Sequence, residues 1–228
     1  MKVWVTRAEP GASETAARLR ALGHQPVTAP LLAVRTLPFE APPGIGALAF
    51  TSRNGVAAAA DRPEAADWRA LPVFAVGNAT AEAARTAGFT QVESAGGDLA
   101  DLCRLLALRR GGWEGSLLHL RAREPAGPLV APEVAVVCVA AYQADELPLA
   151  TQVEEEWDRL DAVLIHSPRA ARAAARATAG QSAWKAAGVC ISEAAAVPIQ
   201  GLAPSVIVAD RPNETALLAA LGKVDVDG

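Results

Sequence analysis

The sequence has no apolar segment long enough to cross a membrane. Its longest uninterrupted apolar run covers residues 134–142, whereas a membrane-spanning helix takes about 20 residues. The chain also lacks the apolar region of a signal peptide, because it enters a strand-like Val3-Trp4-Val5 directly after Met1-Lys2. We therefore expect a cytoplasmic protein that does not bind a membrane.

Cysteine is scarce as well. The chain has 3 cysteines, an odd number, and they lie far apart at Cys103, Cys138 and Cys190. This spacing matches neither a disulfide framework nor a metal-ligand motif. The pattern fits a reducing compartment and a protein that binds no metal.

Two classes of ligand lack their usual signals. Neither G-x-G-x-x-G nor G-x-x-x-x-G-K-[ST] follows a predicted strand, and this absence disfavours a nicotinamide enzyme. The 21 Lys and Arg residues are outnumbered by 25 Asp and Glu residues. The resulting net charge of −4 argues against non-specific binding to nucleic acid. We expect no cofactor and no nucleic-acid partner.

The chain does contain an internal repeat. Residues 47–60 predict a strand end, a polar turn and an alanine-rich helix, and residues 162–175 repeat this pattern. The same offset of 115 residues relates four pairs of landmarks: Ser52 and Ser167, Gly77 and Ser192, Asp98 and Asn213, and Glu9-Pro10 and Glu124-Pro125. The chain therefore consists of two copies of one unit.

Each copy alternates strands with helical segments, which predicts parallel β-α-β units and doubly wound sheets. Ser13, Asn78 and Asp98 are predicted to be helix N-caps, and residues 61–71 are predicted to be a polar connector. Each copy also contains a long extended connector, at residues 26–37 and 134–148. If both connectors cross between the sheets, each copy completes the sheet of the other. We therefore predict an α/β fold of two similar doubly wound parallel-sheet domains, one continuous and one discontinuous. The expected bounds are residues 1–34 with 146–228 for a discontinuous domain and residues 35–145 for an inserted domain.

Ligands of open α/β sheets bind beyond the carboxyl ends of the strands, where helix N-termini point. The residues predicted there are rich in hydroxyls, amides and arginines, which suits the binding of several anionic groups. They contain no nucleophile–base pair, carboxylate pair or metal cluster. The Ser, Thr and Asn residues could equally be turn and helix-cap residues. The candidate binding set is Arg7, Thr51, Ser52, Asn54, Gly77, Asn78, Ala79, Arg121, Ser167 and Ser192.

The histidines give weaker signals than the single tyrosine. His24 follows a helix exit and is expected to be exposed, and His119 lies inside a strand and is expected to be structural. His166 lies at a carboxyl end, but its counterpart in the repeat is Thr51, so it need not be catalytic. Tyr142 ends the apolar strand that leads to the second connector, at the predicted domain boundary. It is either a core-edge residue with its hydroxyl in water or a residue of the functional site.

Several segments, taken in order, resemble the uroporphyrinogen-III synthase family: AFTSRNGV, VFAVGNATAEAARTAGF, LHLRAREP, VAAYQA, VLIHSPRAA and RPNETALLAAL. The resemblance runs from VTRAEPG near the start to the last predicted helix and so covers nearly the whole chain. Its more specific parts are the VGNATA turn and the lone tyrosine followed by glutamine.

This resemblance implies two α/β domains joined by a two-stranded linker, with the active site in a cleft between them. It also implies a cofactor-independent lyase of haem biosynthesis. The implied substrate is hydroxymethylbilane, a linear tetrapyrrole with acetate and propionate on every ring. The enzyme would close the ring, invert ring D and release water, mainly by holding one conformer. We expect a monomer.

The resemblance also assigns roles to residues. Tyr142 would assist the departure of the hydroxyl group, and the binding turns match Thr51 with Ser52, Gly77 with Asn78, and Ser167. The turn that begins at Ser192 departs from the Gly-Pro-Thr-like turn of many members, which puts a specific hydroxyl contact there in doubt. Its backbone amides are not affected by this departure.

A second hypothesis from another class is a catalytically inactive two-domain ligand-binding or sensor protein of the same fold. Such a protein would be free to lose Tyr142 and the turn at Gly77, and this chain keeps both. The sequence therefore favours the synthase.

Overall fold

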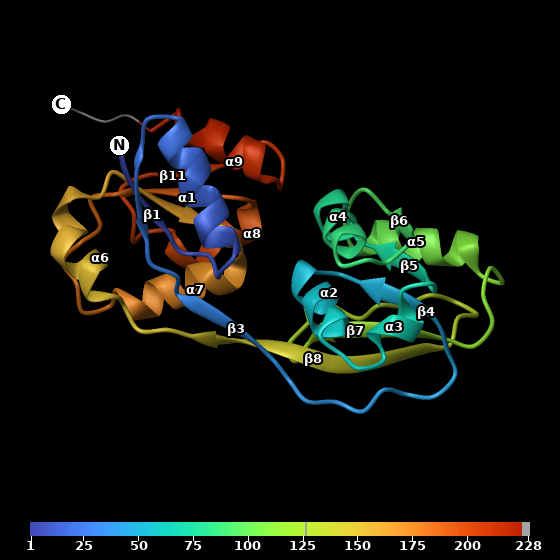
Figure 1. Ribbon diagram of the computed structural model, residues 1–228. Helices are drawn as coiled ribbons and strands as arrows, with labels where there is room; N and C mark the ends of the chain where they lie inside the picture. Colours follow the sequence, from blue (N-terminus) through green and yellow to red (C-terminus); the bar gives the residue numbers. More distant parts are fainter. Residues whose placement is uncertain (126, 225–228) are drawn as a thin grey trace. The chain divides into compact units, whose positions relative to one another are not determined.

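The computed structural model describes residues 1–125 and 127–224, which divide into two compact units. Unit 1 consists of Met1–Ala33 and the chain from Asp145 onward, and unit 2 consists of Val34–Ala144. The expected domain bounds lie one residue from these limits. The chain leaves unit 1 in β3 (Leu32–Thr36) and returns in β8 (Val136–Glu146), two strands that are neighbours in one sheet (Figure 1).

Unit 1 is built on a five-stranded sheet in the order β11-β10-β9-β1-β2. Every pair of neighbouring strands in it is parallel, as the alternation of strands and helices predicts. Its elements are β1 (Lys2–Val5), α1 (Gly11–Ala21), β2 (Gln25–Thr28), α6 (Thr151–Glu156), η1 (Trp157–Arg159), β9 (Ala162–Ile165), α7 (Pro168–Ala177), β10 (Ala187–Cys190), α8 (Glu193–Ala196), η2 (Val197–Ile199), β11 (Val206–Val208) and α9 (Glu214–Leu221).

Helices cover both faces of this sheet. Successive residues of a strand point to opposite sides, so each strand contributes side chains to the core on either face. In β9, Val163 and Ile165 belong to the core that contains α7, whereas Ala162 and Leu164 belong to the core that contains α1 and α9 (Figure 1). All four side chains are fully buried. The sheet is therefore doubly wound.

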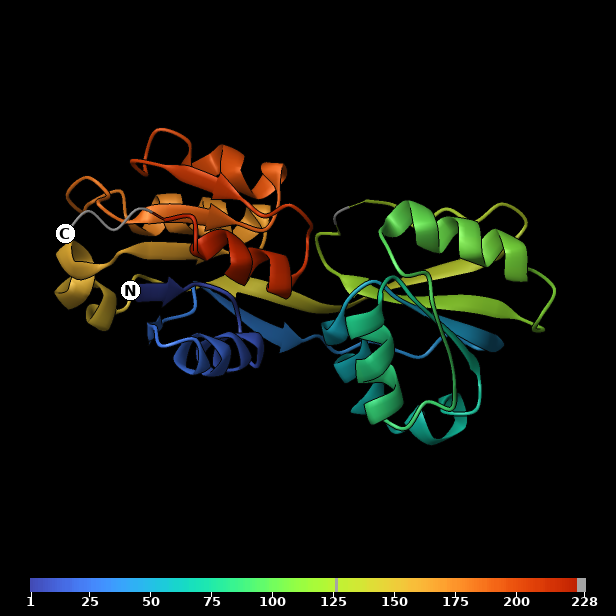
Figure 2. The same ribbon diagram turned by 90° about the horizontal axis from the view of Figure 1, so that it is seen from above.

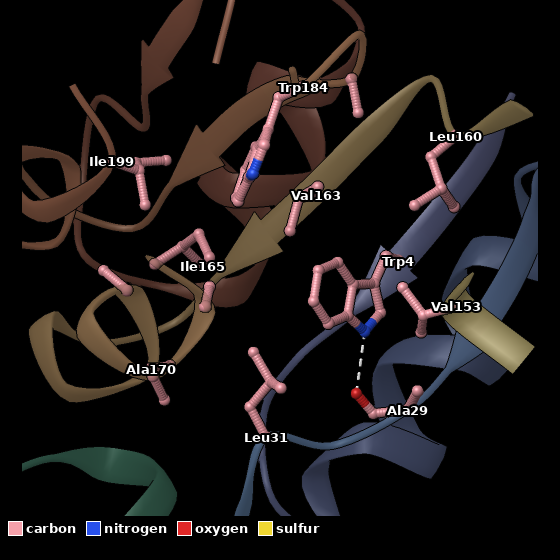
Figure 3. Packing of buried hydrophobic residues seen from close by; sticks show 14 of the residues in the cluster. Trp4, Ala29, Leu31, Val153, Leu160, Val163, Ile165, Ala170, Trp184 and Ile199 are labelled. Carbon is pink, nitrogen blue, oxygen red and sulfur yellow. Dashed lines mark hydrogen bonds between the residues drawn. The ribbon is translucent and has the colours of Figure 1, made fainter. Parts of the chain in front are cut away.

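Three tryptophans, Trp4, Trp157 and Trp184, fill the α7 side of the sheet. Figure 3 shows Trp4 and Trp184 among the buried residues of this core. Trp4 packs edge-to-face against Trp157, with ring centroids 6.4 Å apart, and Trp157 packs in the same way against Trp184 at 5.9 Å. The buried indole N–H of Trp4 donates a hydrogen bond of 2.8 Å to the carbonyl oxygen of Ala29. This bond satisfies the one polar group that the tryptophan brings into the core.

Unit 2 contains a six-stranded sheet in the order β3-β8-β7-β4-β5-β6. The pairings of β4 with β5 and β7, of β5 with β6 and of β7 with β8 are all parallel. Besides β3 and β8, its elements are β4 (Ile45–Phe50), α2 (Arg53–Ala60), α3 (Ala65–Trp68), β5 (Pro72–Ala75), α4 (Asn78–Thr86), β6 (Gln91–Ser94), α5 (Leu99–Arg109) and β7 (Ser116–Ala122).

Unit 2 is doubly wound by the same alternation. Leu48 and Phe50 of β4 pack with α2 and α4, and Ala47 and Ala49 pack with α5. Figure 2 shows α5 on one side of the strands and α2 with α4 on the other. The α/β class and the two parallel sheets predicted from the sequence are confirmed.

Each sheet joins strands from both copies of the repeat. In unit 1, β1 of the first copy pairs with β9 of the second, with Val3 opposite Ala162. In unit 2, β4 of the first copy pairs with β7 of the second, with Ala49 opposite His119. The crossing of the two connectors is therefore confirmed, and α1 packs in the same core as α9.

The structure corrects several local expectations. We expected Ser13 to cap the first helix, but α1 begins after Pro10. We expected Asn78 to cap α4, but the N-cap is Gly77. The strand that we ended at Tyr142 continues to Glu146 as β8. Residues 61–71, expected as a connector, contain the short helix α3.

Asp98 caps α5 as predicted, and its side chain accepts hydrogen bonds from the backbone N–H of Ala100 at 2.8 Å and Asp101 at 3.0 Å. In the part of the chain that the structure describes, no helix is both long and apolar enough to cross a membrane.

The crossed pairing predicts which half of the chain can fold. A fragment of residues 34–144 retains both cores of unit 2 and should unfold cooperatively in urea, with native-like circular dichroism. A fragment of residues 1–113 has nearly the same length but separates β1 from β9 and β4 from β7, and it should lack a cooperative transition. Cooperative unfolding of residues 1–113 would contradict the crossed arrangement.

Candidate functional site

The turn after β4 brings two hydroxyl residues to the carboxyl end of the unit 2 sheet. Ser52 is the N-cap of α2, and its Oγ accepts a hydrogen bond of 3.1 Å from the backbone N–H of Asn54. Gly55 follows in the first turn, where an added Cβ would lie 2.6 Å from the carbonyl oxygen of Leu120 in β7. Only glycine lets the start of α2 approach β7 so closely, and this places Thr51 and Ser52 beside the carboxyl end of β7, the neighbour of β4.

Tyr142 lies in this group. Its side chain is buried in the core beneath α2, with 7% of its surface exposed, and not at a solvated core edge. The phenol interacts with the Ser52 side chain and with the backbone of Ala122. Burial raises the pKa of Tyr142, and these two hydrogen bonds oppose the rise without cancelling it. The phenol is therefore protonated at neutral pH and can donate a hydrogen bond.

His119 lies next to the same turn. Its Nε2 is 3.2 Å from the Thr51 Oγ1, and its Nδ1 is 3.7 Å from the Sγ of Cys138. The residue is buried, with 1% of its surface exposed. Burial lowers the pKa of His119 to about 4, and the positive charge of Arg121 adds to this effect. His119 is therefore neutral at pH 7.

The next turn of unit 2 contains Gly77, Asn78 and Ala79 at the start of α4. Asn78 and Ala79 are at least partly exposed, and the Asn78 Oδ1 accepts a hydrogen bond of 2.8 Å from the Ser94 hydroxyl. The first N–H groups of a helix have no acceptor within the helix. This turn can therefore offer backbone donors and the positive end of the helix dipole to an anion.

The Arg121 guanidinium already makes hydrogen bonds to the protein backbone. Its Nη1 donates to the carbonyl oxygens of Ala122 at 2.9 Å and Arg123 at 3.0 Å. The guanidinium therefore braces the loop after β7. Arg121 contributes charge to this end of the sheet, including the charge that lowers the pKa of His119.

Unit 1 repeats the serine caps. The Oγ of Ser167 accepts from the backbone N–H of Ala170 at 3.1 Å, and the Oγ of Ser192 accepts from that of Ala195 at 3.4 Å. Both serines are half-buried at the carboxyl ends of strands. They act as helix caps, the structural role that the sequence left open for them.

Arg7 lies in a polar cluster of unit 1 that the sequence analysis did not identify. Its Nη1 donates to Glu214 at 2.9 Å, and Glu214 also accepts from the hydroxyl of Thr15 at 2.6 Å. His166 lies 3.1 Å from the same carboxylate through its Nε2. An added Cβ at Gly11 would lie 2.4 Å from the Arg7 Nε, so the guanidinium packs directly on the α1 backbone.

The cluster holds Glu214 ionised. Burial alone raises the pKa of Glu214, but hydrogen bonds from His166 and Thr15 and the charge of Arg7 outweigh burial and lower the pKa to about 2. Burial lowers the pKa of His166, and Glu214 opposes that change. Glu214 lies in the first turn of a helix, where an acidic residue is common for electrostatic reasons. The sequence therefore gave no sign that Glu214 also contacts residues far away in the chain.

The structure thus groups the candidate residues by unit. In unit 2 it brings Thr51, Ser52 and Asn54 together with Tyr142, and it adds His119, which we had expected to be only structural. Within residues 1–125 and 127–224, no three His, Cys, Asp or Glu side chains are placed to hold a metal ion.

The comparisons with known proteins bear on the same segments. The family model described as uroporphyrinogen-III synthase HemD matches residues 13–219. The chain belongs to the uroporphyrinogen-III synthase family. This membership favours the synthase over the inactive binding protein and gives the chain a place in a family of enzymes of haem biosynthesis that act on a tetrapyrrole.

Solved structures of uroporphyrinogen-III synthases share the fold. The chain is similar to uroporphyrinogen-III synthetase from Helicobacter pylori, with 20% identity and a TM-score of 0.65 over 98% of this chain and 99% of that one. It is also similar to a mutant uroporphyrinogen III synthase from Thermus thermophilus, with 18% identity and a TM-score of 0.53 over the same shares. No curated protein matches the sequence.

The low pKa of His119 predicts how stability depends on pH. The unfolded chain takes up a proton near pH 6.5, whereas the folded protein does so near pH 4, so stability is lost as pH falls through this window. One pKa unit corresponds to about 1.4 kcal/mol, which gives a loss of up to about 3 kcal/mol from this group.

Urea denaturation of the wild type and of His119→Gln, at pH 7.5 and at pH 4.5, measures this loss. The wild type should lose more stability than the variant between the two pH values. Equal losses in the two proteins would show that His119 is not a buried neutral group.

Proposed function

We propose that this protein is a uroporphyrinogen-III synthase that cyclises hydroxymethylbilane with inversion of ring D and loss of water. The family match over residues 13–219 carries the proposal. Thr51 and Ser52 follow the carboxyl end of β4, and Tyr142 lies opposite Ala122 at the carboxyl end of β7. The grouping of these three residues supports the proposal, because ligands of open α/β sheets bind at that end.

The substrate has an acetate and a propionate on each of its rings, so it presents many carboxylates at neutral pH. Carboxylates are bound by N–H and O–H donors, and hydrogen bonds to ionised groups are stronger than those between neutral groups. Helix N-termini, hydroxyls and arginines supply such donors in both units. We propose that the binding set consists of Arg7, Thr51, Ser52, Asn54, Gly77, Asn78, Ala79, Arg121, Ser167 and Ser192.

The proposed reaction begins when the C–O bond of the ring A hydroxymethyl group breaks. The electron pair leaves with the oxygen, which departs as water after it takes up a proton, and the remaining cation is conjugated with the pyrrole nitrogen. Tyr142 donates a hydrogen bond to the departing oxygen. Its raised pKa keeps the phenol protonated for this role.

Ring closure then decides the product. The cation is attacked by the substituted α-carbon of ring D, which gives a spiro intermediate. The bond between that carbon and its original methylene bridge then breaks, and the methylene cation so formed attacks the free α-carbon of ring D. Loss of a proton from that carbon restores the pyrrole, balances the proton taken up by the departing water and leaves ring D inverted. Without the protein, the bilane closes to the isomer in which ring D is not inverted. The protein therefore acts mainly by holding one conformer through many carboxylate contacts, which is catalysis by orientation.

Further details of the proposal follow from the chain itself. The reaction is that of a lyase, and the steps above use only groups of the substrate and of the protein, so we propose a cofactor-independent enzyme. The thiols of Cys103, Cys138 and Cys190 are free, which supports a protein of the reducing cytoplasm. We propose that it acts as a monomer.

The product distribution tests the proposed function. Purified protein is given freshly made hydroxymethylbilane, and the ratio of type III to type I uroporphyrinogen is measured after oxidation by chromatography. Type III product should dominate with the protein, and type I should dominate in a sample with heat-denatured protein. The same excess of type I in both samples would reject the proposal and favour the inactive binding protein.

Replacement of Tyr142 by Phe tests its catalytic role. The change removes the hydroxyl but retains the ring in the core beneath α2, so the protein should remain folded. General-acid assistance typically contributes about 10²–10⁴-fold. The hydroxyl is already a good leaving group, since the pyrrole nitrogen stabilises the cation, and kcat should fall by about 10²-fold or less with type III product retained.

The matched comparison is the double replacement of Thr51 and Ser52 by Ala. These side chains are assigned to binding, so this variant should chiefly raise KM. An unchanged kcat for Tyr142→Phe at saturating substrate would reduce Tyr142 to a packing residue and remove its catalytic assignment.

A further inference from the structure

Three polar side chains on neighbouring strands of unit 2 share one face of the sheet. Thr51 lies two residues after Ala49, directly beyond the end of β4. His119 lies two residues after Leu117 on β7, and Cys138 lies two residues after Val136 on β8. Ala49, Leu117 and Val136 all pack in the core beneath α5. Residues two apart on a strand face the same side, so His119 and Cys138 face the side of Leu117 and Val136. The contact of Thr51 with His119 places Thr51 on this side as well, and the three residues form a row.

The strand register brings the members of this row into contact. His119 is opposite Cys138 on one side and opposite Ala49, the neighbour of Thr51 on the same face, on the other. The imidazole joins the two ends, with Nε2 3.2 Å from the Thr51 Oγ1 and Nδ1 3.7 Å from the Cys138 Sγ. His119 is buried, Thr51 is half-buried and Cys138 is exposed. The row therefore runs from the edge region of the sheet to the candidate site.

The charge state of the His119 ring determines which hydrogen bonds it can make. Burial and the nearby Arg121 guanidinium keep His119 neutral at pH 7. A neutral imidazole has one N–H donor and one acceptor nitrogen. The nitrogen that carries the proton therefore decides whether the Thr51 hydroxyl accepts from the ring or donates to it.

The partners favour a proton on Nε2. A thiol is a weak acceptor, so an N–H on Nδ1 would gain little from Cys138, whereas an N–H on Nε2 can donate to the better acceptor, the hydroxyl oxygen of Thr51. The thiol S–H then donates to the unprotonated Nδ1. In this arrangement the Thr51 oxygen accepts from within the protein, and its O–H remains available to a carboxylate.

We propose that His119 is a positioning residue for Thr51: its Nε2–H holds the threonine hydroxyl so that the hydroxyl proton is directed to a substrate carboxylate, with Cys138 fixing the tautomer. This inference rests on the proposed function, because the substrate is the source of the carboxylate. With the opposite tautomer, Thr51 would donate to the ring and present only oxygen lone pairs to an anion. A hydroxyl can donate or accept a hydrogen bond, and the row of three side chains leaves the Thr51 hydroxyl to act as a donor toward the ligand.

Two substitutions of His119 separate this role from a packing role. A glutamine places its amide near the position of Nε2, and an asparagine places its amide near the position of Nδ1. His119→Gln should keep KM for hydroxymethylbilane close to that of the wild type. His119→Asn should raise KM by about two- to tenfold, the effect of losing one hydrogen bond of ordinary strength, with kcat little changed.

Matched controls accompany these variants. His24→Gln makes the same substitution in unit 1, between α1 and the amino end of β2, and should leave KM and kcat unchanged. In a Thr51→Val background, His119→Asn should produce no further increase in KM, because the hydroxyl that it positions is already absent. A full additional increase in that background would overturn the proposal.

The tautomer is measured directly on the folded wild type. Nitrogen-15 NMR of histidine-labelled protein at pH 7 should show His119 protonated at Nε2 and unprotonated at Nδ1. Protonation at Nδ1 would overturn the proposal even if no variant could be purified.

The kinetic outcomes distinguish this inference from the function on which it rests. A wild type that forms no type III product fails the proposed function and the inference with it. A wild type that forms type III product, with equal KM for His119→Gln and His119→Asn, fails the inference alone.

Discussion

The pairing of β1 with β9 and of β4 with β7 is the constraint on which the rest of the structure depends. Each pair lies inside its sheet and joins strands from different copies of the repeat, so neither sheet can form from one half of the chain. The same pairing creates the polar contacts at the carboxyl ends. It brings Arg7 to Glu214, which lies 207 residues away, and Thr51 to His119, which lies 68 residues away. The candidate site is therefore a product of the crossed topology and not of any local motif.

The arginines of the candidate binding set make different contacts in the two units. In unit 1 the guanidinium of Arg7 is balanced by Glu214, and in unit 2 the guanidinium of Arg121 donates to backbone carbonyls. Arg121 keeps its positive charge, but its Nη1 is engaged by the backbone, and Arg7 is engaged by Glu214. Neither arginine therefore offers its whole guanidinium to one carboxylate. Hydroxyls and helix N-termini supply the remaining donors, each with a modest contribution. A set of many moderate contacts suits a reaction in which the conformer of a flexible poly-carboxylate decides the product.

The sequence predicted the sheets well because their signals are local and periodic. The offset of the repeat located β4, β9, β5 and β10, and the prolines and extended runs located the crossing connectors. Caps were predicted less reliably, since Asp98 was correct while Ser13 and Asn78 were not. The prediction that Asn78 caps α4 was wrong because glycine can also begin a helix. The amide oxygen of Asn78 instead accepts a hydrogen bond from Ser94.

The contacts of His119, Glu214 and Tyr142 could not be predicted in the same way. Each depends on register and on residues distant in sequence, for which a single chain gives no signal. A histidine within an apolar strand looks the same whether it fills space or holds a hydroxyl, and only the neighbouring strands distinguish these cases. The resemblance to the synthase family identified Tyr142, but the interaction of its phenol with Ser52 required the structure.

The central claim is that the carboxyl-end turns bind the carboxylates of the tetrapyrrole. Backbone amide NMR of the wild type, titrated with a bilane that lacks the hydroxymethyl group and so cannot react, tests this claim most directly. We expect the largest shifts in residues 51–55, 77–80, 121–123, 167–170 and 192–195. Shifts confined to the amino ends of the strands, such as residues 44–46, 115–117 and 160–162, would contradict it.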